Sequence, residues 1–121
     1  MRFNRPSKLY SWLFVGSVAV TLYFLNVEMQ SYLGRQAIEK TGLASLSFEE
    51  ASLRSRSEGK LILADVSAIW CSSCRRLDRQ VFANSEVKRV IEKRFIFARI
   101  EYESEEGVRF VERYDVGSFP T

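Results

Sequence analysis

The longest uncharged segment constrains this chain more than any other feature. Leu9 to Val27 (LYSWLFVGSVAVTLYFLNV) contains 19 residues without a charge. As a helix it would be about 28 Å long at 1.5 Å per residue, close to the hydrocarbon thickness of a bilayer. Tyr10, Trp12 and Tyr23 lie toward its ends, where aromatic rings favour the membrane interface. The sequence therefore predicts one N-terminal transmembrane helix at residues 9–27.

Basic residues precede this segment and predict its orientation. Arg2, Arg5 and Lys8 account for the whole formal net charge of +3, because basic and acidic side chains balance in the rest of the chain. The positive-inside rule predicts that residues 1–8 form a cytoplasmic tail and that the chain after Val27 is periplasmic or otherwise extracytoplasmic. The expected location is a single-pass anchor in the inner (cytoplasmic) membrane. A cleaved signal peptide and a buried helix of a soluble protein stay open as alternatives.

Composition limits what the remaining residues can form. A chain of 121 residues with 46% hydrophobic and 27% charged side chains allows one globular domain. It contains no histidine, which removes Cys-His and Ser-His-Asp nucleophile systems and most zinc sites. Acidic and basic side chains are mixed, so nucleic acid is not an expected partner. Residues 28–47 are interpreted as a juxtamembrane connector, with Gly34 and Gly42 as breaks and a short amphipathic helix through Tyr32, Leu33 and Ile38.

Helical and strand patterns alternate in the domain expected at 48–121. Capping residues and apolar spacing predict helices at 48–56 and 72–81. Two further helices are expected to begin after the caps Asn84 (or Ser85) and Ser104. Continuous apolar runs predict buried strands at 60–66 and 95–100. Cys74, Leu77 and Val81 are expected on the inner face of the second helix and Asp78 on its outer face. Val87, Val90 and Ile91, and then Val108, Val111 and Tyr114, are the expected inner positions of the last two helices. This order predicts an α/β fold with a parallel central pair of strands.

Cys71 and Cys74 form a C-x-x-C pair between a predicted strand and a predicted helix. A helix N-terminus stabilises a thiolate, so the pair is suited to thiol–disulfide exchange. Cys71 is expected to be the more exposed sulfur and the nucleophile, and Cys74 the resolving thiol. A structural disulfide, half of a zinc site and a copper site are the alternatives.

The segment Asp65-Val-Ser-Ala-Ile-Trp70-Cys71-Ser-Ser-Cys74-Arg75 resembles the active-site segment of the thioredoxin superfamily, with an Asp six residues before the first Cys and a Trp directly before it. Val81 to Val87 and Val116 to Thr121 are similar to the C-terminal thioredoxin-like domain of the DsbD family of transmembrane thiol:disulfide interchange proteins. The resemblance runs from about residue 48 to residue 121. It implies a thioredoxin-like fold.

The resemblance also implies roles for individual residues. Asp65 matches the buried carboxylate that helps to deprotonate the resolving cysteine, and its alternative is a strand-end Asp that faces water. Trp70 matches the aromatic residue beside the site, with core packing as the alternative. Pro120 matches the cis-proline opposite the disulfide, where Phe119 and Pro120 would meet a substrate strand.

Three features depart from the family pattern. Ser73 occupies the position where thioredoxin has Pro, and Ile69 stands where many members have a polar residue. The family fold continues after the cis-proline with a β-hairpin and a helix, so the sequence is expected to be a fragment or to need cover from another chain. Arg75 and Arg76 are expected to favour the thiolate, or else simply to form a solvated helix face.

These observations predict a membrane-anchored thiol–disulfide oxidoreductase that reduces disulfides of extracytoplasmic proteins through Cys71 and Cys74. Its partners would be disulfide-containing proteins and a membrane or thioredoxin-type redox partner, which would reduce the pair again because no flavin or nicotinamide motif is present. No metal or organic cofactor is expected. An oxidase or isomerase with the same site, and a non-catalytic thioredoxin-like binding module, are the alternatives.

Overall fold

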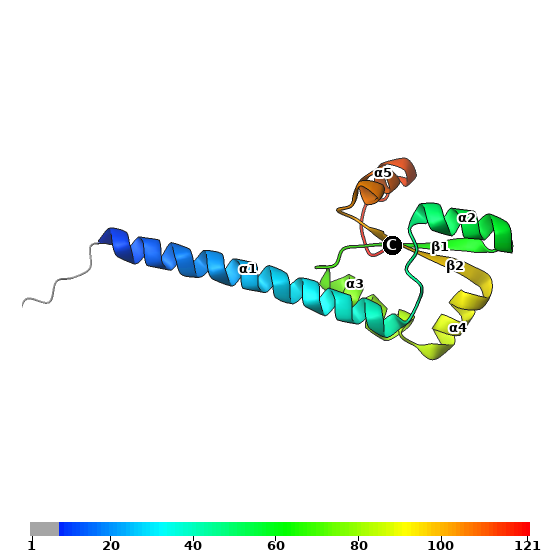
Figure 1. Cartoon of the computed structure of the whole chain (residues 1–121), viewed down its shortest axis with the longest axis horizontal. Coiled ribbons are helices and arrows are strands. Elements are labelled where there is room, and N and C mark those ends of the chain that lie inside the picture. Colours follow the sequence, from blue (N-terminus) through cyan, green and yellow to red (C-terminus); the bar gives the residue numbers. More distant parts are fainter. Residues whose placement is uncertain (1–7) are drawn as a thin grey trace, which may run out of the picture.

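A computed structural model describes residues 8–121 (Figure 1). The expected cytoplasmic tail lies outside the described residues except at its last position. A long helix, α1 (Lys8–Thr41), projects from an α/β unit formed by the rest of the chain. The unit contains, in chain order, α2 (Phe48–Glu58), β1 (Leu61–Ser67), α3 (Ser72–Leu77), the π-helical turn η1 (Asp78–Phe82), α4 (Ser85–Arg94), β2 (Phe95–Glu101) and α5 (Glu105–Tyr114).

The ends of the helices follow the capping residues in the sequence. Ser47 accepts a hydrogen bond from the Glu50 N–H, and the Glu50 carboxylate accepts one from the Ser47 N–H, which completes a capping box at the start of α2. Gly59 ends α2 with φ of 66°, in the left-handed region that favours glycine. Asn84 and Ser104 cap α4 and α5 by accepting hydrogen bonds from backbone N–H groups of the first turn. The expected helix starts are therefore confirmed.

The two strands pair in parallel along their whole length. Leu61 lies opposite Phe95, and Asp65 lies opposite Arg99. Leu46 adds an isolated parallel bridge to Ala98 on the other side of β2. The predicted parallel central pair is confirmed, and its register places Asp65 and Arg99 side by side on one face.

Helices cover both faces of this sheet. Figure 1 shows α2 and α5 on one side of the strands and α1, α3 and α4 on the other. Side chains alternate between the faces along each strand. One core contains Ala51, Ile96 and Ala98, and the other contains Leu43, Phe82, Ile91 and Phe97. The unit is therefore a three-layer α/β/α arrangement.

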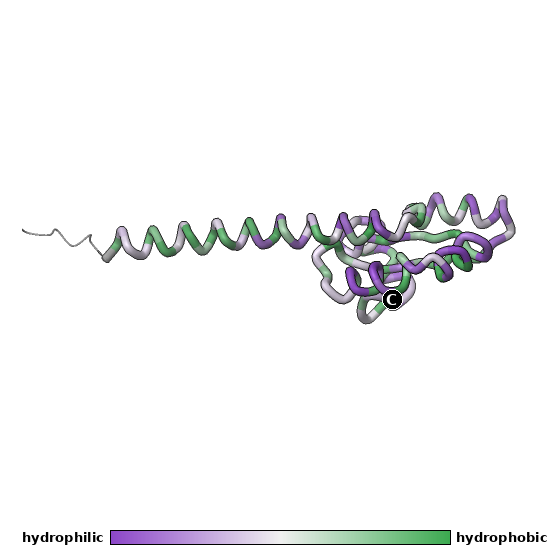
Figure 2. The backbone as a smooth tube through the Cα atoms, turned by 90° about the horizontal axis from the view of Figure 1, so that it is seen from below, coloured by the Kyte–Doolittle hydropathy of each residue, from purple (hydrophilic) through white to green (hydrophobic). Residues whose placement is uncertain are grey.

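Helix α1 has two parts with different surroundings. Every residue from Leu9 to Val27 is exposed, and the helix is long and apolar enough to cross a membrane. Figure 2 shows this free part as a mainly hydrophobic stretch of the tube. The helix then runs on through Gly34 to Thr41, where a connector with a break was expected. Its buried positions are Gly34, Ala37 and Thr41, spaced three and four residues apart along one helix face.

In three helices, the residues predicted to face inward are not the ones that the structure buries. Asp78 was expected outside but is 2% exposed, whereas Val81 is 38% exposed. The Ala83 N–H donates to the Asp78 carbonyl five residues back, and this wider π-helical turn changes which residues point inward. In α4, Val90 is half exposed and Ile91 is the buried position.

Helix α5 packs through its glycine rather than through Val108. Val108 is 51% exposed, and Gly107 is buried against the end of β2. A Cβ atom at Gly107 would lie 2.1 Å from the Glu101 carbonyl oxygen. Because only glycine lacks a Cβ atom, only glycine allows the helix to approach the β2 backbone this closely. Tyr114 is also half exposed, although its ring contacts Phe48 and Phe110.

Candidate functional site

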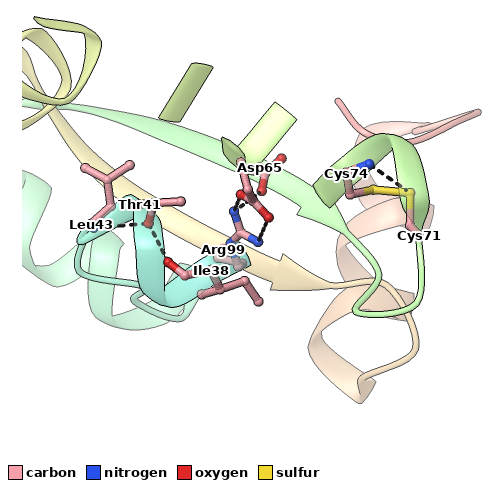
Figure 3. Close-up of polar contacts among 8 residues, drawn as sticks. Ile38, Thr41, Leu43, Asp65, Cys71, Cys74 and Arg99 are labelled. Atoms are coloured by element: carbon pink, nitrogen blue, oxygen red, sulfur yellow. Dashed lines mark hydrogen bonds and ion pairs between the residues drawn. A yellow bond between two sulfur atoms is a disulfide. The ribbon is translucent and has the colours of Figure 1, made fainter. Parts of the chain in front are cut away.

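Cys71 and Cys74 are joined by a disulfide at the N-terminus of α3 (Figure 3). Cys71 is the N-cap residue of this helix, and the Cys74 N–H donates to the Cys71 Sγ over 3.2 Å. A reduced Cys71 would therefore receive a backbone hydrogen bond and the positive end of the helix dipole. This geometry agrees with the expectation that α3 presents the cysteine pair at its first turn.

Both cysteines are buried, and Cys71 is the more exposed of the two, as expected. Cys71 is 7% exposed and Cys74 is 3% exposed, so the difference between the two residues is small. Both cysteines pack with Ala68, and the Phe119 side chain lies against this cluster. Phe119, far along the sequence, supplies cover that the C-x-x-C spacing does not reveal.

Ser73 contributes a hydroxyl to the site. Its Oγ lies 3.2 Å from the Cys71 Sγ. A hydroxyl can donate to a thiolate, so Ser73 can stabilise a reduced, ionised Cys71. In the sequence, Ser73 is notable only because thioredoxin has a proline at this position. Its position directly between the two cysteines was the signal that could have marked it as functional.

Aromatic side chains form a rim beside the disulfide. Trp70 is 46% exposed, and its ring contacts Phe119 at a centroid distance of 6.0 Å. The Tyr102 ring also contacts Phe119, at a centroid distance of 4.5 Å. The Trp70 Nε1–H donates to Glu103 over 3.0 Å, and this hydrogen bond holds the indole in its place in the rim. Trp70 is therefore not a core residue, and this rim offers an apolar surface next to the sulfurs.

The segment that contains Pro120 lies alongside β1. The Phe119–Pro120 peptide bond is cis. Thr121 pairs with Val66 through two backbone hydrogen bonds, of 2.8 Å from the Val66 N–H and 3.4 Å from the Thr121 N–H. The structure thus brings Phe119 and Pro120 to the same edge of the sheet as the cysteine pair, as the sequence resemblance implied.

Asp65 belongs to a buried cluster of charges behind the disulfide. Arg99 forms a bidentate pair with Asp78, with one hydrogen bond of 3.1 Å from Nη1 to Oδ2 and a second from Nη2 to Oδ1. The same Nη2 lies 3.1 Å from Asp65 Oδ2, at ion-pair distance but without the angle of a hydrogen bond. Figure 3 shows Arg99 facing Asp65, with the end of α1 beside them. One guanidinium therefore serves two carboxylates.

This cluster changes the protonation of Asp65. Burial raises the pKa of the Asp65 carboxyl above its ordinary value, Arg99 and Ser67 partly offset the rise, and the Asp78 carboxylate adds to it. Asp65 is 4% exposed, so the alternative of a water-facing strand end is excluded. Cys74, Asp78 and Arg99 line one gap too narrow for a water molecule. Cys74 and the Asp78–Arg99 pair are therefore neighbours.

Helix α1 and the loop before Cys71 are in direct contact. Arg75 donates from Nη1 to the Trp70 carbonyl over 2.9 Å and from Nη2 to Gln30 Oε1 over 2.6 Å. A Cβ atom at Gly34 would lie 2.1 Å from the Ile69 carbonyl oxygen. The guanidinium of Arg75 therefore ties the cysteine loop to α1, in addition to placing a positive charge near the sulfurs.

Residues 43–121 match a family model described as thioredoxin-like. The chain belongs to the thioredoxin-like family. Its α/β fold also resembles a thioredoxin from Thermus thermophilus, with a TM-score of 0.60 and 24% identity over 64% of this chain and 60% of that one. A candidate disulphide-isomerase from Bacteroides thetaiotaomicron has a TM-score of 0.56 and 35% identity over 64% of each chain.

One curated relative is the UBX domain-containing protein 2 of Schizosaccharomyces pombe. It is 30% identical over 78 residues, which is 64% of this chain and 18% of the relative. The chain thus spans less than a fifth of that protein and about three fifths of the two solved structures.

Sequence reasoning missed two acidic residues of this thioredoxin-like domain. Glu101 Oε1 accepts a hydrogen bond from the Ile69 N–H over 3.2 Å, and Glu103 holds the Trp70 indole. Burial raises the pKa of the Glu101 carboxyl. Glu101 is the last residue of β2 and Glu103 lies two residues beyond it, at the end of the sheet where parallel strands bring their carboxyl ends together. That position was the available signal for their role in holding the cysteine loop.

Proposed function

We propose that the chain is a membrane-anchored thiol–disulfide oxidoreductase that reduces disulfides of extracytoplasmic proteins through Cys71 and Cys74. The observation that carries the proposal is the cysteine pair at the N-terminus of α3, joined as a disulfide beside an aromatic rim and a cis-proline. The uncharged, exposed part of α1 supports membrane anchoring. The sequence likeness to the DsbD domain favours the reducing direction.

The proposed reaction starts from the reduced pair. The Cys71 thiolate attacks one sulfur of a substrate disulfide, and the other substrate sulfur leaves as a thiolate and takes up a proton. A mixed disulfide now joins Cys71 to the substrate. The helix N-terminus and the Ser73 hydroxyl stabilise the attacking thiolate. Trp70, Phe119 and Pro120 are the proposed contacts for the substrate segment that carries the disulfide.

Cys74 completes the exchange. Its thiol gives a proton to the charge cluster, where Asp65 is the proposed acceptor, and its thiolate attacks the Cys71 sulfur. The second substrate sulfur leaves as a thiolate, and the Cys71–Cys74 disulfide forms. Two electrons have then moved from the pair to the substrate. A dithiol redox partner returns the pair to its reduced form by the reverse exchange.

The test uses the full chain in lipid nanodiscs. Cys74→Ser is expected to accumulate a mixed disulfide with a model substrate, and Cys71→Ser is expected to form none. A redox titration against glutathione, read by alkylation mass shift, then gives the direction. A potential near about −270 mV supports a reductase, and one near about −120 mV would make it an oxidase. Equal trapping by both variants would contradict the assigned nucleophile.

A second candidate is a non-catalytic binding module with an inert disulfide. The 7% exposure of Cys71 favours it. In that case the reduced chain would resist a small alkylating reagent at Cys71 and would not reduce a model disulfide. A reduced Cys71 that reacts at least as fast as a free thiol would remove this candidate. The same measurement would leave open an isomerase, the role in the name of the Bacteroides protein.

A further inference from the structure

A cationic groove lies between α1 and the cysteine helix. It has a volume of about 350 Å³ and is lined by Leu33 of α1 and by Ser72, Arg75, Arg76, Arg79 and Gln80 of α3 and η1. Three of these six residues are arginines and none is acidic. Arg76 and Arg79 are exposed, and no ion pair involves either of them within residues 8–121. The groove therefore presents positive charge to an outside anion.

The distance from this groove to the hydrophobic segment is short. Leu33 comes six residues after Val27, so it lies about 9 Å farther along the same uninterrupted helix. The polar head-group region of one leaflet is about 5–8 Å thick. If residues 9–27 span the hydrocarbon, the groove opens at the level of the lipid phosphates or just above it.

The orientation of the groove is held by contacts close to the membrane. Gln30 accepts a hydrogen bond from Arg75, and Gly34 lies against the Ile69 backbone. Ala37 and Thr41 are buried farther along the same helix. Figure 1 shows α3 running alongside α1, with the loop that leads into α3 on the side of the free helix. The anchor therefore cannot rotate about its axis without breaking contacts with the cysteine loop.

We infer that this groove binds the phosphate groups of anionic phospholipids and docks the disulfide edge of the domain on the bilayer surface. The inference rests on the proposed membrane anchor. Arginine suits the ligand because its planar guanidinium pairs with phosphate oxygens through two hydrogen bonds. Docking would limit exchange to partner disulfides that reach the membrane surface. Arg76 and Arg79, which form no ion pair within residues 8–121, acquire a role in placing the site.

The test compares arginine accessibility in two kinds of nanodisc. The oxidised full chain is placed in discs of phosphatidylcholine alone or with one third phosphatidylglycerol, and treated with phenylglyoxal. Peptide mass spectrometry then gives the modification rate of each arginine. Arg76 and Arg79 are expected to react several-fold more slowly in the anionic discs, and 0.5 M salt should remove the difference. The exposed Arg89 on α4 should react equally in both.

The outcomes separate this inference from the proposed anchor. A chain that does not enter discs overturns the anchor and the docking together. A chain that enters both discs but shows equal rates at Arg76 and Arg79, or an equal decrease at Arg89, overturns the docking alone. Inorganic phosphate is added to the neutral discs as a further arm. Equal protection by phosphate there would overturn the lipid as the occupant.

A matched pair of variants gives an independent measure. Arg76→Gln/Arg79→Gln and Arg89→Gln/Lys93→Gln each remove two positive charges from exposed helix positions. Native mass spectrometry of chains released from mixed discs counts the phosphatidylglycerol molecules that stay bound. The first variant is expected to retain fewer than the wild type, and the second the same number. Equal retention by the two variants would overturn the inference.

Discussion

The two faces of the β1–β2 sheet differ in composition, because one is apolar throughout and the other combines an apolar core around Phe97 with a buried cluster of charges. On the face toward α2, Ile96, Ala98 and Ile100 occupy alternate positions of β2 and are all buried. On the other face, Arg99 lies between Asp65 and Asp78 and close to Cys74. The first face gains stability from apolar contact, which does not depend on pH. The second keeps buried charge close to Cys74, and keeping charge out of water costs stability.

The largest expected effect comes from removing the shared cation. Arg99→Met leaves two carboxylates buried without a positive partner, and breaking a buried ion pair in this way costs about 3–5 kcal/mol. The loss should be large at pH 7 and smaller at pH 4, because burial raises the pKa of the Asp65 carboxyl and its protonation removes one of the two unpaired charges. Urea unfolding of the chain in detergent micelles, followed by Trp70 fluorescence in a Trp12→Phe background, measures it.

Ile100→Ala on the apolar face is the control for this comparison. It deletes a fully buried side chain and should cost about 2–5 kcal/mol at both pH values. If the losses from Arg99→Met and Ile100→Ala depended on pH in the same way, the distinction between the two faces would be wrong.

A smaller effect is expected where α1 packs against the charged face, which is the face of the sheet that carries Asp65 and Arg99. Gly34→Ala places a methyl group against the Ile69 carbonyl, and overpacking of this kind costs about 1–3 kcal/mol. The same change at Gly16, where no atom lies within 4 Å, should leave the domain unchanged. Urea unfolding of both variants gives the stability, and the rate of Cys71–Cys74 reduction by dithiothreitol should rise only for Gly34→Ala. Equal behaviour of the two variants would show that α1 does not close this face.

Asp65→Asn tests the titration of the charged face. The raised pKa means that the folded protein binds the Asp65 proton more tightly than the unfolded chain does. Its contribution to stability is therefore full below the unfolded pKa of about 3.9 and is lost as pH rises through the folded pKa, by about 1.4 kcal/mol for each unit between the two. The variant should lack this loss when unfolding is measured from pH 4 to pH 8. An unchanged pH profile would contradict a raised Asp65 pKa.

The smallest effect is expected from Ser73→Ala at the edge of the charged face. Loss of the hydroxyl beside the Cys71 sulfur removes one donor to the thiolate, with a net effect of about 0.5–1 kcal/mol. Alkylation of reduced Cys71 at pH 7 should slow about two- to five-fold, with no change in the urea midpoint. Ser72→Ala, on the neighbouring exposed position, is the control and should not alter the rate.

The sequence alone determined the local features of this protein. The caps Ser47, Asn84 and Ser104 start their helices as predicted, because a capping side chain bonds to backbone atoms only two or three residues away. The parallel strands, the exposed apolar segment and the cysteine pair at a helix N-terminus follow from equally local patterns. Phe119 and Pro120 were placed at the site only through the family resemblance.

The burial of individual side chains depends on the tertiary structure. Asp78 was assigned to solvent because helical spacing predicts its direction but not the π-helical turn or the Arg99 partner from β2 that allow its burial. Gly34 and Gly107 are inward-facing because another backbone passes over them, at distances that no periodicity encodes. The same holds for the cover over Cys71, the Glu101 and Glu103 contacts and the arginine groove. Each depends on segments that are distant in sequence, and their approach is set by the packing of the whole domain.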